Sequence, residues 1–520
     1  MEHEIKSPTM GKQLTILEDA VLLFVLTLYL FVPPLHSVVQ NRILQFLRAH
    51  FASDIQFSDF DVSLYPSVHV TIHELVLRYK GRTDLPPLVD VREVSIEASL
   101  RSLTQSRPRI KSVRLVGLKI RMPPRPRGDE PLVRPTDEDL QREYPALVEE
   151  IRADDAVIII MRALPKKSSR EFLIHHLLLR NVSFDRPATF HAVLANSVPP
   201  GEIDSSGEFG PWHAAAPSTT PVSGQYTFRD ADLGTLKGIQ GTLSSEGRFN
   251  GQLDYLRVNG KTDTPNFTLR TAAHPMALHT EFSAMVDGTN GNTYLESIRA
   301  TFSHSSLAVS GKVVDIDPEK KGRTIVLLAA AQNARVEDLV QLGVKTDEPV
   351  MTGIVKLKTE IEIPEGDGDL VERLKVNGSF EITDGQFTSP KVQTRVDVLS
   401  RKAQGQPTRS GINDVASHMA GTFSVAHDVV TFSSLHFCVA GAAMHVHGTY
   451  DLDAEALDFR GTLAMQAKLS QTTSGAKSFL LKAFDPLFKD KDAGSRLPIK
   501  ISGTKEHPVF GLDHPLTSKL

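Results

Sequence analysis

Val68-His-Val-Thr-Ile72-His-Glu-Leu75-Val-Leu77 is the stretch of this 520-residue chain from which the fold can be predicted. Up to Ile72, apolar and polar residues alternate, which is typical of a strand with one apolar and one polar face. The three-residue step from Ile72 to Leu75 changes face, unless a bulge or a bend absorbs the extra residue. The stretch therefore predicts a strand, a kink and a second strand segment.

The apolar-x-x-apolar-x-apolar unit of this stretch recurs along the chain. Its copies begin at Ile72, Val91, Ile110, Ile174, Leu295 and Phe432. The first three copies start at residues 72, 91 and 110, and the segments 72–78 and 174–180 are close copies of each other. Repetition of one short unit indicates stacked supersecondary elements that bury a common face.

Asn-Gly and Asp-Gly pairs separate the expected strands and predict hairpin turns, because such turns need a positive φ angle. These pairs stand at 250–251, 259–260, 287–288, 290–291, 377–378 and 384–385. Local hairpins between one-sided strands build a meander. We therefore expect a mainly β protein: a long, curled antiparallel sheet that forms an open groove, with an N-terminal transmembrane helix and a few short capping helices.

An apolar run at 20–33 predicts a membrane anchor near the N-terminus. Its side chains include Ala20, Leu22, Phe24, Leu26, Leu28, Leu30 and Val32. A bilayer core needs about 20 apolar residues, so a span would start further upstream, with Glu18 and Asp19 at the interface. A cleaved signal peptide is the alternative, but no small-x-small cleavage site follows the run. Residues 37–50 have helical spacing and could lie on the membrane surface or pack on the body.

Three segments interrupt the strand pattern. Residues 123–135 are rich in proline and predict an extended loop, and the spacing after Thr136 predicts a helix that runs to Ile151. Residues 197–222 and 401–409 predict two further loops. The expected domains are a membrane anchor at 1–36, an N-terminal β region at 37–122, a loop, helix and linker region with strands at 123–222, central β-groove repeats at 223–455, and a C-terminal region at 456–520.

The C-terminal region combines a helix with further strands. Residues 474–488 predict an amphipathic helix, whose apolar stripe contains Phe479, Leu480, Phe484, Leu487 and Phe488. Alternation at 497–504 predicts a strand after it. We expect the helix to cap the end of the sheet, because an uncovered sheet edge would promote aggregation.

Composition and motifs argue against several functional classes. The 58 basic and 62 acidic side chains nearly balance, so nucleic acid is not an expected partner. The one cysteine, Cys438, excludes an intrachain disulfide, and we interpret it as a small buried hydrophobic residue. The sequence has no phosphate-binding loop, dinucleotide fingerprint or nucleophile elbow, so we expect no enzyme and no cofactor. His445 and His447 share a strand face but lack a third ligand, so we expect no metal.

Three features together resemble the AsmA-like family of bacterial envelope proteins, the relatives of AsmA and TamB. They are the single N-terminal anchor, the strand run at 55–122, and the C-terminal block at 459–513 with its Leu497-Pro-Ile-Lys-Ile-Ser-Gly-Thr and His507-Pro-Val-Phe-Gly-Leu-Asp motifs. The resemblance covers both ends of the chain well and the middle only in style. Its motifs are hydrophobic patterns, and the chain is shorter than the bridging members of the family.

The resemblance implies a single-pass inner-membrane protein with the bulk of the chain in the periplasm. Its groove would shelter phospholipid acyl chains and transfer them toward the outer membrane, as part of envelope lipid homeostasis. The alternative is a scaffold or chaperone-like factor for outer-membrane protein assembly, with outer-membrane assembly components as partners. A glycan-binding module is a third class, weakened by one Trp and eight Tyr. The candidate groove-lining residues are Val70, Ile72, Val94, Ile96, Val113 and Leu115.

Overall fold

The computed structural model is mainly β and describes most of the chain between residues 53 and 513. The described ranges are 53–63, 67–79, 86–103, 109–122, 147–160, 170–183, 185–211, 213, 217–272, 274–317, 320, 322–343, 348–366, 369–370, 372–409, 413–474, 494–504 and 507–513. These residues form two compact units. Unit 1 holds the described residues up to 160 with 173–192 and 208–220, and unit 2 holds 170–172, 193–207 and 221–513.

Unit 1 is built on short strands and one helical turn. Its elements are β1 Ser53–Gln56, β2 Asp59–Ser63, β3 Val68–Tyr79, β4 Val89–Ala98, α2 Leu100–Leu103, β5 Arg109–Val116, β6 Lys119–Met122, β7 Leu147–Ile160 and η1 Pro217–Thr219. Three strands contribute residues to both units, namely β8 Arg170–Val182, β9 Ala188–Ser197 and β10 Pro200–Phe209.

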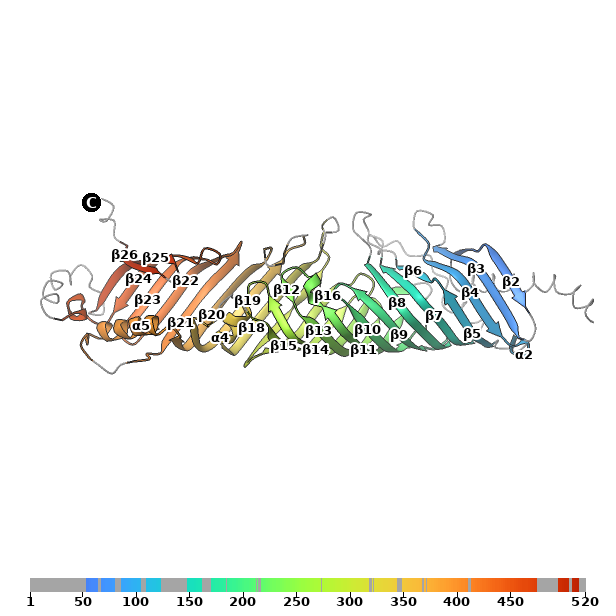
Figure 1. The fold of residues 1–520 in the computed structure, drawn as a ribbon, viewed down its shortest axis with the longest axis horizontal. Helices are drawn as coiled ribbons and strands as arrows, with labels where there is room; N and C mark the ends of the chain where they lie inside the picture. Colours follow the sequence, from blue (N-terminus) through green and yellow to red (C-terminus); the bar gives the residue numbers. More distant parts are fainter. Residues whose placement is uncertain are drawn as a thin grey trace, which may run out of the picture. The chain divides into compact units, whose positions relative to one another are not determined.

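Unit 2 is a long meander with two helices beside it (Figure 1). Its strands are β11 Pro221–Asp232, β12 Ile239–Gln240, β13 Thr242–Gln252, β14 Tyr255–Leu269, β15 Met276–Val286, β16 Thr293–Phe302, β17 Ser305–Val314, β18 Thr324–Arg335, β19 Met351–Ile363, β20 Lys375–Phe387, β21 Ser417–Ala426, β22 Val429–Val439, β23 Ala442–Asp451, β24 Ala456–Met465, β25 Ser495–Thr504 and β26 Pro508–Leu512. Its helical elements are η2 Leu233–Thr235, α4 Val336–Gly343, α5 Pro390–Ala403 and η3 Leu469–Thr472.

The predicted β class is confirmed, but the sheet is not purely antiparallel. From β13 to β26 each strand pairs antiparallel with the next. In unit 1, however, β7 runs parallel to both β5 and β6. Parallel neighbours need a long crossover connection, and the 24 residues 123–146 separate β6 from β7.

The helix predicted up to Ile151 is wrong in its last part, because β7 begins at Leu147. Val148 pairs with Ile110 and Ile151 pairs with Val113 on β5, so sheet pairing outweighs the helical spacing of these apolar residues. The rest of that prediction, and the loop at 123–135, lie outside the described residues. The loop predicted at 197–222 is also partly wrong, since β10 occupies ten of its residues.

The predicted kinks are confirmed at the three-residue steps of β3, β16 and β22. In β16 the register shifts between Leu295 and Ile298, and in β22 it shifts between Phe432 and Leu435. In β3 the kink falls on Glu74, which has a left-handed φ of 55°. In each case the irregularity lets both apolar residues of the step serve one face. The copies in β16 and β22 are therefore bulged strands, and the copy in β3 is a kinked strand.

Most of the predicted Asn-Gly and Asp-Gly turns are wrong. Only the pairs at 287–288 and 290–291 lie in a hairpin loop, and the others lie within β13, β14 and β20. Aromatic rings explain two of these glycines. A Cβ on Gly260 would lie 3.0 Å from Phe282 Cζ, and one on Gly378 would lie 3.0 Å from Phe423 Cε1. These glycines leave room for a cross-strand ring rather than for a turn.

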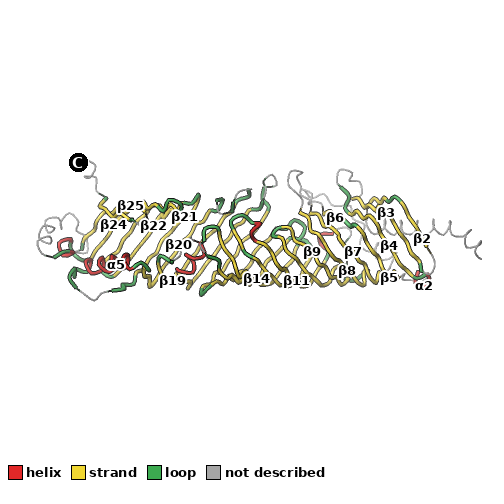
Figure 2. Tube along the Cα trace, viewed as in Figure 1, coloured by secondary structure: helices red, strands yellow, loops and turns green. Residues whose placement is uncertain are grey.

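Two apolar cores lie where helices pack on the sheet of unit 2. The first core joins Val336 of α4 to residues of β18, β19 and β20. The second joins Val396 and Ala403 of α5 to residues of β22, β23 and β24. Both helices lie at the same strand ends of the sheet (Figure 2). This is because the strands that precede them, β18 and β20, run in the same direction. Neither helix was predicted from the sequence.

The described residues contain no helix that is long and apolar enough to cross a membrane. The expected anchor at 20–33, with its seven apolar residues from Ala20 to Val32, lies outside the described residues. Most of the helix predicted at 474–488, including Phe479, Leu480, Phe484, Leu487 and Phe488, also lies outside them.

Gly461→Ala is expected to destabilise unit 2 by about 1–3 kcal/mol, the usual cost of overpacking. An added Cβ would lie 2.0 Å from His445 O on the neighbouring strand, which cannot move without disturbing the sheet. Urea unfolding followed by circular dichroism measures the change. Gly343→Ala in α4 is the control, because nothing lies within 4 Å of its Cβ position. Equal stability of both variants would contradict the close packing.

Candidate functional site

One face of the unit 2 sheet carries an uninterrupted row of mainly apolar residues that crosses every strand from β13 to β26. Each member pairs with the next across neighbouring strands. This first row, which begins on β11, is Tyr226, Gly247, Gly260, Phe282, Ile298, Val309, Ala329, Thr359, Gly378, Phe423, Phe432, Gly448, Phe459, Ile501 and Phe510. The face that bears it is called the apolar face.

A second row on the apolar face runs beside the first. Its members are Gly224, Phe249, Val258, Ala284, Leu295, Gly311, Leu327, Ile361, Val376, Val425, Val430, Tyr450, Leu457, Gly503 and Pro508. Neither row contains a charged residue. In β16 the row members Leu295 and Ile298 stand three residues apart, and the register shift between them keeps both rows on one face.

Phenylalanines concentrate on the apolar face in β20–β24. The rings of Phe380 and Phe423 are 6.1 Å apart, those of Phe423 and Phe432 are 6.4 Å apart, and those of Phe432 and Phe459 are 5.8 Å apart. Such distances suit tilted aromatic contacts. Phe380, Phe423 and Phe432 are nevertheless only half-buried. Part of this aromatic surface is therefore open to an apolar ligand.

Opposite ends of the unit 2 strands come into contact at one place. Asp369 and Leu370 follow β19 at one set of strand ends, whereas η2 and the end of β14 lie at the opposite strand ends. Leu370 N donates a hydrogen bond to Lys237 O at 3.3 Å. Arg270 Nε lies 3.2 Å from Asp369 Oδ2. A straight strand of 13 residues is about 40 Å long. The strands must therefore curve along their length for their opposite ends to meet.

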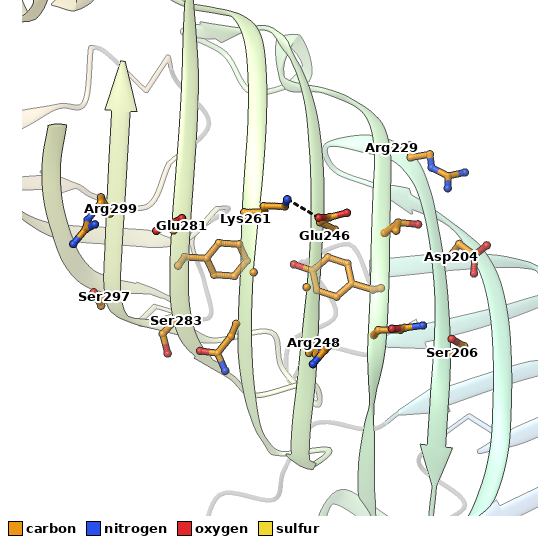
Figure 3. Close-up of a pocket in the computed structure, with 17 residues that line it drawn as sticks. Asp204, Ser206, Arg229, Glu246, Arg248, Lys261, Glu281, Ser283, Ser297 and Arg299 are labelled. Atoms are coloured by element: carbon orange, nitrogen blue, oxygen red, sulfur yellow. Dashed lines mark ion pairs between the residues drawn. The ribbon is translucent and has the colours of Figure 1, made fainter. Parts of the chain in front are cut away.

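The opposite face of the sheet is polar and carries an open depression of ≈ 1080 Å³ across β10 to β16 (Figure 3). Glu246, Lys261, Glu281 and Arg299 follow one another there on successive strands. Lys261 Nζ lies 2.8 Å from Glu246 Oε1, and this hydrogen bond raises the pKa of Lys261. Alternating opposite charges neutralise each other pairwise, as expected of a solvated sheet face.

The structure brings together the six groove-lining candidates of unit 1. They form two cross-strand rows on β3, β4 and β5, which are Val70–Ile96–Val113 and Ile72–Val94–Leu115. Their burial differs, however. Val70, Ile72 and Val94 are 4%, 3% and 5% exposed, whereas the other three are half-buried. The first three are core positions of unit 1.

On the polar face a third histidine lies beside His445 and His447, the two histidines that the sequence places on one strand face. His436 on β22 pairs with His445 on β23, and their ring centroids are 3.9 Å apart. His447 follows on the same face of β23. The described residues contain no group of three or more His, Cys, Asp or Glu arranged to hold a metal ion. His436 was missed because cross-strand partners are not adjacent in sequence.

Cys438 is half-buried, not buried as expected. It faces the same side of β22 as His436 and pairs with His418 on β21. The alternation of β22 therefore places the thiol on the polar face, although apolar residues flank it in the sequence.

His436→Ala is expected to raise the pKa of His445 toward its ordinary value. Burial lowers the pKa of His445, and the positive charges that His436 and His447 can carry lower it further. Removing the stacked ring reduces the first two effects, so His445 should take up its proton at higher pH. NMR titration of labelled histidines measures this, with His304→Ala as a distant control. An unchanged pKa of His445 would contradict the coupling.

The apolar face could be predicted only in part from the sequence, which indicated one-sided strands but not their register. No family model, curated protein or solved structure matches this chain.

Proposed function

We propose that unit 2 shelters the acyl chains of phospholipids on its apolar face. The observation that carries this proposal is the pair of unbroken, uncharged rows that cross the sheet while most of their members stay half-buried. A closed core would bury these residues, and a solvated sheet would carry polar ones. Burial of each CH₂ group contributes about 0.8 kcal/mol, so a long acyl chain gains enough to bind.

The bend of the sheet supports a groove with the apolar face on its inner side. Helix α4 packs on that face through Val336 and also contacts β14, four strands away from β18. An eight-residue helix is about 12 Å long, whereas four flat strand spacings cover about 19 Å. Curvature toward α4 brings β14 within its reach. The contact of Asp369 and Leu370 with the opposite strand ends favours the same curvature.

The cellular setting follows from the resemblance to AsmA-like proteins. We propose a single-pass anchor at 20–33 in the inner membrane and a periplasmic body that passes phospholipid toward the outer membrane. Ordered rows without charge suit such movement, because an acyl chain could slide along them without meeting a polar barrier. The partners would be phospholipids and the inner membrane, with no catalytic step and no nucleic acid.

A second candidate function rests on β26 at the end of the meander. Among the described residues β26 pairs only with β25, and its Val509, Phe510 and Leu512 are 59%, 63% and 52% exposed. An exposed edge strand can accept a strand from another protein. A scaffold for outer-membrane protein assembly would use this edge to hold its clients.

Mass spectrometry of bound small molecules tests the proposed function. Residues 36–520, which lack the apolar run, would be produced with their native lipids present and purified without detergent. We expect phospholipid at a stoichiometric ratio. A folded but lipid-free protein would contradict the proposal and favour the scaffold, which crosslinking from β26 to β-barrel clients would then support.

A further inference from the structure

A third row on the apolar face differs from the first two at one end. Its members from β18 onward are apolar or glycine, namely Ala331, Leu357, Phe380, Gly421, Leu435, Val446, Gly461, Ile499 and Leu512. On β13, β14 and β15, however, the same face carries Ser245, Thr262 and Thr280 in direct cross-strand register. Hydroxyl groups thus concentrate at one place on a face that is otherwise nearly all hydrocarbon.

The hydroxyl group of Ser245 makes its hydrogen bonds within the protein. Ser245 Oγ donates to Lys261 O at 3.1 Å. It is therefore free to accept the hydrogen bond from Tyr226, whose hydroxyl lies 3.1 Å away. Burial raises the pKa of Tyr226, so the phenol keeps its proton and remains the donor. No donor is left over in this pair.

Thr262 and Thr280 differ from that pair because one of their two hydroxyl hydrogens has no acceptor among the described residues. Their Oγ1 atoms lie 2.6 Å apart, and one hydroxyl donates to the other. Two hydroxyl groups carry two hydrogens, and this bond uses one. Neither hydroxyl makes another hydrogen bond among the described residues. One donor on a part-buried, mainly apolar surface is therefore left for an external acceptor, and leaving it unpaired would cost free energy.

The surroundings decide which acceptor suits this donor. The residues beside the pair in the first row are Gly260 and Phe282, which offer no charge. The nearest basic residue in the register, Lys261, belongs to the polar face and pairs with Glu246. A phosphate would lie there without a counter-charge, which is costly in apolar surroundings. A neutral carbonyl attached to hydrocarbon fits both the donor and the apolar rows.

We infer that the Thr262–Thr280 pair binds the ester carbonyl of an acyl chain that lies on the apolar face. This inference rests on the proposed function and names the part of the lipid that the site recognises. One hydrogen bond fixes the position of the ester, while the flanking rows hold the chain by burial alone. The pair would thus favour esterified chains over plain hydrocarbon.

The test compares two probes of similar length on the full chain, kept soluble by an amphipathic polymer. The probes are heptadecane and methyl palmitate, of which only the second has a carbonyl. In the double variant Thr262→Val, Thr280→Val we expect methyl palmitate to bind about two- to tenfold more weakly, the factor for one hydrogen bond. Heptadecane should bind equally to both proteins. Thr449→Val, which removes an exposed hydroxyl from the polar face of β23, should change the binding of neither probe.

Infrared spectroscopy gives a readout that a change in packing would not move. The carbonyl stretch of ¹³C-labelled methyl palmitate should shift to lower frequency on the unmodified chain and on Thr449→Val, but not on the double variant. If the double variant loses both probes equally, or the shift persists in it, the inference is wrong while the proposed function stands. If neither probe binds the unmodified chain, both are wrong.

Discussion

Phe437→Ala is expected to lower the free energy of unfolding of unit 2 by about 3–5 kcal/mol. The ring is 6% exposed and lies in the core that α5 forms with β22, β23 and β24. Its centroid is 6.2 Å from that of Phe387 on β20. Truncation would leave a cavity between α5 and the sheet, where the backbone of the meander cannot close in. Urea unfolding followed by circular dichroism measures the loss.

Phe510→Ala is the matched control for that prediction. The same side chain is removed from β26, where it is 63% exposed. Surface changes of this kind usually stay within about 0.5 kcal/mol. Equal losses at the two positions would mean that α5 does not seal a core of unit 2.

Leu327→Asp is expected to reduce phospholipid binding by at least about tenfold while the chain stays folded. Leu327 is half-buried in the second row, between Gly311 and Ile361. A carboxylate there would interrupt the apolar face, and an acyl chain that passes it would have to desolvate the charge. Lipid recovered with the purified protein measures the effect, and circular dichroism checks the fold.

The chain supplies its own control for this variant. Leu328 is the next residue, and it points to the polar face with 54% exposure. Leu328→Asp introduces the same charge into the same strand, but away from the proposed lipid. We expect it to bind phospholipid as the unmodified chain does. Equal binding by both variants would contradict the role of the apolar face.

The strand character of the chain could be predicted because alternation and bulge signals are local. The step from Phe432 to Leu435 already indicated a bulge, and the register shift there confirms it. The helix predicted up to Ile151 failed for the opposite reason. Whether Val148 and Ile151 join a sheet depends on β5, which lies more than thirty residues earlier, and no local pattern contains that information.

The glycine pairs show a similar limit. Asn377-Gly378 has the composition of a turn, but Gly378 lies in the middle of β20 opposite Phe423. The ring needs the space that a side chain would fill, and only the register reveals this. Helix α5, by contrast, had a local signal that was missed. Pro390 stands in its first turn, and Val392, Val396 and Leu399 follow at helical spacing.

The candidate site, like the fold, could be predicted only in part from the sequence. The sequence indicated apolar strands but placed its candidate residues in unit 1, where Val70, Ile72 and Val94 are buried. The continuous rows of unit 2 depend on how the bulges align from strand to strand. The Thr262–Thr280 pair depends on it as well, since the two residues stand on different strands.

Photo-crosslinking in living cells tests the central claim most directly. A benzophenone amino acid would replace Ile361, which faces the second row, and in a separate strain Glu362, which faces the polar side of the same strand. We expect the full chain to capture phospholipid from position 361 and little from position 362. Capture of lipid at neither position, or equally at both, would contradict an apolar face that carries acyl chains.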